Sequence, residues 1–237
     1  MQKPKCFAIV LAGGSGKRMG TKVQKQYLEI DGKPVLFYSL NEFQKSEIID
    51  DIILVVGEGQ EEYCKKEIVD KYHITKVSNI VLGGKERFHS VWNGLKAIKE
   101  DGYVFIHDGA RPMITEEILE RALSCVEENN ACVVGMPVKD TIKIADSGGH
   151  IAETPNRSLV WMVQTPQVFE YRLIKEAYEE LLKREQELLE QGITVTDDAM
   201  VVETLSGHKV KLVEGSYENI KITTPEDIKL AECFMKS

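Results

Sequence analysis

The sequence has 237 residues, enough for one large α/β domain with a buried core, and its 43% hydrophobic and 29% charged residues are ordinary for a globular protein. Its net charge of −8 argues against broad nucleic-acid binding, which needs a basic surface to neutralise phosphates. No stretch approaches the roughly 20 apolar residues of a membrane span, and Gly13-Gly14 ends the first apolar run too early for a signal-peptide core, so we expect a cytoplasmic protein with no nucleic-acid and no membrane partner.

Apolar, β-branched runs alternate along the chain with longer amphipathic segments. The short runs predict strands at Phe7–Leu11, Ile52–Val56, Ile80–Leu82, Val104–His107 and Cys132–Pro137. The amphipathic segments predict helices at Glu86–Lys99, Thr115–Glu128 and Tyr171–Glu190, one after Thr196, and a last one that Thr224 caps. This alternation predicts an α/β fold with a doubly wound, mostly parallel, Rossmann-like sheet and helices on both faces.

The segment 138–163 departs from this alternation. A Gly148-Gly149 pair lies between two short alternating runs, Thr141–Ala145 and His150–Thr154, which is a β-hairpin signal. Because a lone two-stranded hairpin is marginal in water, we expect this arm to pack on something else, such as a partner subunit. No linker or repeat interrupts the rest, so we predict a single domain over 1–237 with a protruding β-arm at 138–163.

A glycine-rich run, Leu11–Gly20, follows the first predicted strand directly. A Walker A loop would need Ser or Thr where Arg18 stands, and a Rossmann fingerprint would need glycine where Met19 stands. Glycines at the carboxyl end of a strand let backbone N–H groups approach an anion, and the cations of Arg18 and Lys25 suit a triphosphate. On this run alone, a loop that merely turns the chain stays an open alternative.

Further motifs extend over nearly the whole chain and are specific in combination rather than singly. They comprise Ala12–Met19, Lys25–Leu28, Gly83–Arg87, Ser90–Leu95, His107–Pro112, Pro137–Lys143, Gln164–Gln167, Thr196–Ala199, Val213–Ser216 and Asn219–Asp227. With these motifs in this order, the chain resembles the cytidylyltransferases of the non-mevalonate isoprenoid pathway, which act on 2-C-methyl-D-erythritol 4-phosphate. The resemblance implies that CTP and this sugar-alcohol phosphate react to give 4-diphosphocytidyl-2-C-methyl-D-erythritol and pyrophosphate.

The resemblance also implies roles for individual residues. The nucleotide would contact Ala12, Gly13, Gly14, Ser15, Gly16, Gly84, Lys85, Ser90 and Asp108. The substrate would contact Asp108, Arg111, Thr141, Arg157, Thr165 and Lys221. Catalysis would rest on Arg18, Lys25, Arg157 and Lys221. The Asp108 carboxylate would help to place Mg²⁺, the expected cofactor.

Plainer interpretations of some side chains stay beside these roles. Asp108 could cap a helix or pair with Arg111 in a loop salt bridge. We expect His107 to be a packed neutral histidine without a chemical role. We also expect Trp161 and Met162 to lie in the core rather than to form a stacking platform for a base.

Three rival functions are possible beside the one that the resemblance implies. The nearest is the same chemistry on ribitol 5-phosphate, whose enzymes we expect to carry an alanine-valine pair where this chain has Gly109-Ala110. A non-catalytic CTP-binding protein would be expected to lose Lys25, Asp108 or Lys221, and a nicotinamide-dependent dehydrogenase needs the missing third glycine. The resemblance further implies a homodimer in which the arms interlock across a two-fold axis and each arm completes the partner's site.

Overall fold

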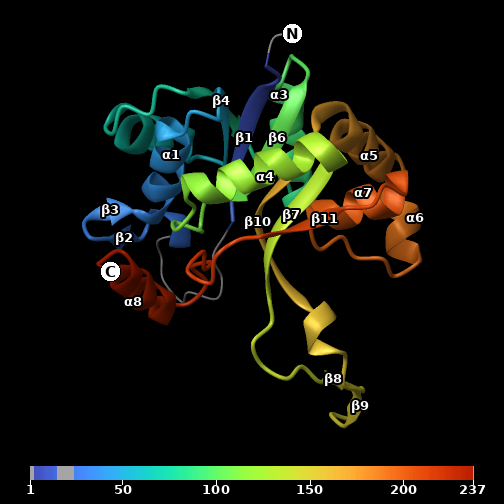
Figure 1. Ribbon diagram of the computed structural model, residues 1–237. Helices are drawn as coiled ribbons and strands as arrows, with labels where there is room; N and C mark the ends of the chain where they lie inside the picture. The colour runs from blue at the N-terminus through green and yellow to red at the C-terminus, as the bar shows by residue number, and fades with distance from the viewer. Residues whose placement is uncertain (1–2, 15–23, 237) are drawn as a thin grey trace.

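The computed structural model describes residues 3–14 and 24–236, which are built around a seven-stranded sheet (Figure 1). From one edge to the other its strands are β11 (Lys211–Glu214), β7 (Ala131–Pro137), β10 (Trp161–Glu170), β6 (Gly102–Asp108), β1 (Lys5–Ala12), β4 (Asp51–Val56) and β5 (Val77–Leu82). Neighbouring strands are parallel, except that β10 is antiparallel to both β6 and β7. The five predicted strands all lie in this sheet, whereas β10 and β11 were not predicted.

Helices cover both faces of the sheet, which confirms the predicted fold class. On one face the core cluster includes side chains from α1 (Val35–Lys45), the π-helix η3 (Cys64–Asp70) and α4 (Glu116–Asn129). On the other face it includes side chains from α3 (Arg87–Ala97), α5 (Tyr171–Lys183), α6 (Glu185–Glu190) and α7 (Asp198–Ser206). Strand β1 is buried between the two, because Cys6, Ala8 and Val10 belong to the first cluster while Phe7 and Ile9 belong to the second.

Smaller elements complete the body of the molecule. A third cluster joins α8 (Pro225–Phe234) to α1 and to β2 (Glu29–Ile30), which pairs with β3 (Lys33–Pro34) in a short hairpin. The remaining short helices are η2 (Lys25–Tyr27), α2 (Glu61–Tyr63) and η4 (Arg157–Leu159). Within the described ranges, no helix combines the length and the apolar character that crossing a bilayer requires.

Two helix predictions had different outcomes. Thr224 caps α8 through a reciprocal capping box with Asp227, as expected from its sequence. The prediction of one long helix over Tyr171–Glu190 is wrong at Arg184, where φ of −109° and ψ of 10° separate α5 from α6. The break redirects the chain so that Leu188 is buried in the same cluster as α5.

The segment 138–163 extends away from the body as an arm (Figure 1). Near its tip, β8 (Ile144–Ala145) and β9 (Ile151–Glu153) pair antiparallel, which confirms the predicted hairpin in a shorter form. Gly149 turns the chain there with a φ of +81°, a conformation that favours glycine. The prediction that Met162 lies in the core is wrong: its side chain is 46% exposed where β10 runs back from the arm, and Trp161 beside it is only half-buried.

Candidate active site

The candidate site lies at the carboxyl ends of β1, β5 and β6. Because these strands are parallel members of one sheet, the loops that follow them meet at the same edge. A cavity of about 360 Å³ lies there, lined by Leu11, Gly13, Gly14, Lys25, Gln26, Gly84, Lys85, Glu86, Arg87, Ser90, Asp108, Ala110 and Lys221. Of the described residues in this first cavity, four are cationic and two are acidic, so it suits an anion.

Gln26 shapes the loop that follows β1. Its amide nitrogen lies 2.6 Å from the carbonyl oxygen of Ala12 and 3.1 Å from that of Gly14, and its side chain is almost fully buried. These bonds tie the loop to η2, which carries Lys25 into the cavity. Sequence reasoning assigned Gln26 no role. The other predicted residues of this loop, Ser15, Gly16 and Arg18, lie outside the described residues.

The loop after β5 packs tightly against the start of α3. A Cβ at Gly84 would lie 2.3 Å from the Cβ of His89, so this close approach requires glycine. The Ser90 hydroxyl accepts a hydrogen bond from the Gly84 N–H at 3.0 Å and donates to the Glu86 carbonyl at 3.3 Å. Ser90 therefore holds the loop in place, and it lines the cavity beside Gly84 and the exposed Lys85.

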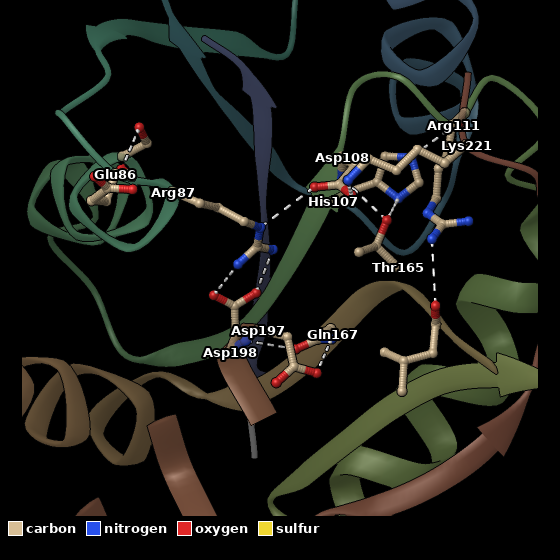
Figure 2. A network of polar contacts seen from close by, with 12 residues as sticks. Glu86, Arg87, His107, Asp108, Arg111, Thr165, Gln167, Asp197, Asp198 and Lys221 are labelled. Carbon is tan, nitrogen blue, oxygen red and sulfur yellow. Dashed lines mark hydrogen bonds and ion pairs between the residues drawn. The ribbon is translucent and has the colours of Figure 1, made fainter. Parts of the chain in front are cut away.

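Asp108 ends β6 and forms part of the cavity wall, with 8% of its surface exposed. Lys221 Nζ donates to its Oδ2 at 2.6 Å, and Arg87 Nε lies 3.6 Å from its Oδ1 (Figure 2). Burial by itself raises the pKa of this carboxyl, but the cations of Arg87 and Lys221 outweigh burial and hold the pKa well below its usual range. In the described part of the chain, Asp108 forms its ion pairs with these two residues rather than with Arg111.

A second cavity, of about 330 Å³, lies on the other side of Asp108. Its lining residues are Arg87, Asp108, Arg111, Val163, Gln164, Thr165, Gln167, Thr196, Asp197 and Lys221. Arg87, Asp108 and Lys221 line both cavities and so form the wall between them. The described residues that were predicted to contact the nucleotide line the first cavity, except Ala12, which is buried. Arg111 and Thr165, which were predicted to contact the substrate, line the second cavity.

A buried chain of hydrogen bonds fixes Asp108 from behind. His107 is fully buried, and its Nε2 lies 3.1 Å from the carbonyl oxygen of Arg111, which can only accept a hydrogen bond. Its Nδ1 is therefore the acceptor for the Thr165 hydroxyl at 3.1 Å, and the same hydroxyl accepts the backbone N–H of Asp108. Burial lowers the pKa of His107 to about 4, which confirms the predicted neutral histidine.

Arg111 presents positive charge to the second cavity. Its guanidinium donates to the backbone carbonyls of Asn219 at 2.8 Å and Val163 at 3.4 Å, and its buried Nε has no hydrogen-bond partner among the described residues. Within residues 3–14 and 24–236 it forms no ion pair with a carboxylate. A guanidinium held in this way by backbone groups keeps its charge available for an anionic ligand such as a phosphate.

Arg87 occupies a position that sequence reasoning did not anticipate. Its guanidinium extends between two carboxylates, those of Asp198 and Asp108 (Figure 2). Asp198 lies 111 positions further along the chain and begins α7. In the sequence it has the appearance of a solvated acid in the first turn of a helix, so only the tertiary structure shows that it is buried and paired.

Two predicted site residues lie apart from both cavities. Thr141 and Arg157 are exposed on the arm, and Arg157 donates to the carbonyl oxygen of Lys139 at 2.9 Å. Neither residue lines the first or the second cavity. Within one described chain, the predicted site is therefore only partly assembled.

Known proteins resemble this chain over nearly its full length. Residues 6–237 match the model of the family described as 2-C-methyl-D-erythritol 4-phosphate cytidylyltransferase. A relative of that name from Lachnospira eligens is 52% identical over 229 residues, covering 97% of this chain and 98% of its own. Another from Lachnoclostridium phytofermentans is 49% identical over 232 residues, covering 98% and 97%.

Solved structures give the same result. A 4-diphosphocytidyl-2C-methyl-D-erythritol synthase from Anaerococcus prevotii has a TM-score of 0.85 and 35% identity, covering 99% of this chain and 97% of its own. A 2-C-methyl-D-erythritol 4-phosphate cytidylyltransferase from Francisella tularensis has a TM-score of 0.78 and 26% identity, covering 97% and 99%. The chain therefore belongs to the 2-C-methyl-D-erythritol 4-phosphate cytidylyltransferase family.

Proposed function

We propose that the first cavity holds CTP, that the second holds the phosphate of 2-C-methyl-D-erythritol 4-phosphate, and that the two react at their shared wall. The observation that carries this proposal is that Arg87, Asp108 and Lys221 line both cavities. Transfer between two anionic substrates needs them held together with their charges balanced. Two cations around one ionised carboxylate provide that balance at the meeting point.

The activity follows from membership of the family. The chain is a cytidylyltransferase of isoprenoid precursor biosynthesis, converting CTP and 2-C-methyl-D-erythritol 4-phosphate to 4-diphosphocytidyl-2-C-methyl-D-erythritol and pyrophosphate. Ribitol 5-phosphate is not favoured, because the relatives about half identical to this chain are named for the methylerythritol substrate. The cytoplasmic location and the lack of a nucleic-acid partner stay predictions.

The reaction requires charge stabilisation more than proton transfer. An oxygen of the substrate phosphate attacks the α-phosphorus of CTP, the new P–O bond forms, and the bond to the bridging oxygen breaks to release pyrophosphate. The attacking phosphate is already an anion, so no strong general base is needed. Lys25 and Lys221, both in the cavity wall, would stabilise the negative charge that builds during transfer. We assign the same role to Arg18, Arg157 and the backbone of the glycine loop.

Mg²⁺ is the metal that we propose for this site, and the donor set fits it. Magnesium in nucleotide enzymes takes one or two carboxylates, with phosphate and water oxygens completing its shell. Asp108 offers one ionised carboxylate, whose Oδ1 is beyond hydrogen-bond distance from Arg87. No cluster of three or more His, Cys, Asp or Glu able to hold a metal occurs among the described residues, so the phosphates of CTP would complete the site. A bound ion would neutralise charge on the triphosphate.

We further propose a homodimer in which each arm completes the partner's second cavity. Thr141 and Arg157 suit a phosphate but lie on the arm, outside both cavities of their own chain. The apolar side chains that the arm and its base expose are Ile144, Ile151, Leu159, Met162 and Val163. Exposed apolar side chains gathered on one segment favour an interface, and two-fold symmetry would make two identical composite sites.

Pyrophosphate release tests the substrate assignment. The protein is incubated with CTP, Mg²⁺ and either 2-C-methyl-D-erythritol 4-phosphate or ribitol 5-phosphate, and UTP, ATP and GTP replace CTP in parallel reactions. We expect fast turnover with CTP and the methylerythritol substrate. A wrong base would leave buried hydrogen-bonding groups of the nucleotide pocket unpaired, and this would lower turnover with the other nucleotides. Equal turnover with ATP or GTP, or a preference for ribitol 5-phosphate, would contradict the proposal.

A further inference from the structure

Arg87 is held in a single orientation by the carboxylate of Asp198. Its Nη1 donates to Oδ1 at 2.8 Å and its Nη2 donates to Oδ2 at 2.7 Å, a planar two-point grip. With those two nitrogens engaged, the remaining Nε faces Asp108 at 3.6 Å. The same guanidinium is part of the wall between the two cavities. Its position there therefore depends on where Asp198 lies.

Asp198 is in turn fixed by buried groups from two other elements. Its side chain is fully buried, and the hydroxyl of Tyr178 on α5 donates to its Oδ1 at 2.5 Å. Gln167 on β10 accepts the backbone N–H of Asp198 through its Oε1 at 3.0 Å. Burial, and then the neighbouring carboxylate of Asp198, raise the pKa of Tyr178, so it stays protonated as a donor. Asp198 is thus held through its carboxylate by α3 and α5 and through its backbone N–H by β10.

This arrangement is more than a surface ion pair. A buried carboxylate costs several kcal/mol of desolvation unless it is paired and hydrogen-bonded, and Asp198 has both kinds of partner. If the pair only joined α7 to α3, apolar residues could do so without this cost. The network instead holds one charged group, in a defined direction, at the place where we propose that the two substrates meet.

We propose that Asp198 and Tyr178 are positioning residues of the transfer reaction: they hold the Arg87 guanidinium against Asp108 at the wall between the two cavities. This inference rests on the proposed function, which places the reacting phosphates at that wall. Arg87 then keeps the Asp108 carboxylate fixed opposite Lys221 while charge moves during transfer. Asp198 and Tyr178 act only through Arg87.

The test is a double-mutant cycle read through kcat and KM. Asp198→Asn and Tyr178→Phe are each made alone and together with Arg87→Gln, in the full-length protein with CTP, 2-C-methyl-D-erythritol 4-phosphate and Mg²⁺. We expect Asp198→Asn to lower kcat by about 10²-fold, because small misplacements at a reacting centre cost that much. The KM for CTP should not rise, since losing a carboxylate makes the site more positive. Tyr178→Phe should lower kcat less, by about 10-fold, because only one hydrogen bond is lost.

Non-additivity is the signature of an effect transmitted through Arg87. In the Arg87→Gln background, neither Asp198→Asn nor Tyr178→Phe should reduce kcat further, because the group that they position is already gone. Tyr171→Phe is the matched control: Tyr171 is a buried tyrosine of the same helix whose hydroxyl bonds the carbonyls of Leu95 and Ile98, away from both cavities. It should lose some stability and keep its kcat.

The outcomes separate this inference from the proposed function. Losses that multiply in the double variants, or a wild-type kcat in a folded Asp198→Asn variant, would overturn the positioning role. Circular dichroism and thermal unfolding identify a variant that fails to fold, and Tyr178→Phe, which removes a single oxygen, then decides the question on its own. Lys221→Ala is measured alongside: full turnover in that variant would overturn the site assignment itself, whatever Asp198 does.

Discussion

At the sheet edge, Asp108, Lys221 and Arg87 lie in one network of ion pairs and hydrogen bonds within a single chain, whereas Thr141 and Arg157 lie exposed on the arm. In the first group, Asp108 ends β6 and Arg87 begins α3, and both elements belong to the packed core of the body. The second is held by a short hairpin whose apolar side chains face solvent. The body therefore brings the proposed nucleotide site together within one chain, while under the proposed dimer the substrate site receives its arm residues from a second copy.

The largest effect is expected at the sheet edge. Lys25→Ala should lower kcat by about 10²–10³, because it removes a cation that meets charge developing in the transition state. The melting temperature and the oligomeric state should stay unchanged, since the side chain lines a cavity rather than the core. Steady-state kinetics checks the loss, and Lys66→Ala, at an exposed ion pair with Glu62, is the control. Near-full turnover in Lys25→Ala would contradict a catalytic role for Lys25.

A charge placed on the arm should weaken the proposed dimer rather than the chemical step. Leu159 is 78% exposed in the single chain, and in Leu159→Asp the new carboxylate would be buried at the proposed interface. We expect the dimer dissociation constant to rise by a factor of about 30, equivalent to about 2 kcal/mol. Activity should then depend on enzyme concentration. Sedimentation measures the change, Leu230→Asp on α8 is the control, and an unaltered dissociation constant would contradict the interface.

Gly84 and Gly149 allow the two regions to be compared with the same substitution. Gly84→Ala should raise the KM for CTP about 10-fold, since overpacking costs 1–3 kcal/mol and the loop must move away from His89. Gly149→Ala strains the arm turn, where φ is +81°, but should leave the KM for CTP unchanged. Kinetics at varied CTP checks both. Equal changes in the KM for CTP in the two variants would contradict the assignment of nucleotide binding to the body rather than to the arm.

The smallest effect concerns the stability of the body alone. Asp227 accepts hydrogen bonds from the backbone of Thr223 and Thr224, and these bonds outweigh burial and lower the pKa of its carboxyl. A lowered pKa in the folded state contributes stability that is complete above the unfolded value of about 4 and is lost as the pH falls through the folded value. Asp227→Asn should cost about 1 kcal/mol at neutral pH, with a smaller difference at pH 3. Denaturant unfolding at both pH values measures the difference in free energy of unfolding between the wild type and Asp227→Asn. A difference that does not change with pH would contradict this role of the Asp227 carboxylate.

Much of the fold could be predicted because the buried strands have continuous apolar sequences. Strands β1 and β4 are buried on both faces, so their β-branched runs were recognised directly. Strand β10 was missed because Gln164, Pro166 and Gln167 interrupt its apolar pattern, and its pairing with β7 shifts register at that point. The exposed start of β10 also explains the wrong expectation for Met162, whose environment belongs to the arm rather than to the core.

Parts of the site could be predicted where the functional groups lie within one short sequence motif. Glycines after a strand are recognisable because their function depends on the adjacent backbone, whereas the role of Asp108 followed from the family resemblance. The partners of Arg87 could not be predicted, since Asp198 and Tyr178 become neighbours only when α5 and α7 pack beside α3. Sequence patterns record local periodicity and cannot register a contact between residues 111 positions apart.

A mixture of two damaged subunits tests whether each site is built from two chains. Lys25→Ala damages the body of its own site, while Arg157→Ala on the arm should damage the partner's site. In a mixed dimer, both lesions fall in one site and the other site is intact. Free reassortment makes half of the dimers mixed, so about a quarter of all sites should recover.

The measurement is turnover after the two inactive variants are dissociated together and allowed to reassociate, with native mass spectrometry to count mixed dimers. Each variant treated alone should stay nearly inactive. We expect activity that rises with the mixed-dimer fraction and approaches about a quarter of the wild-type value at equal amounts. Mixed dimers that form without recovered activity would place Arg157 in its own subunit's site, or outside the site, and would contradict the account.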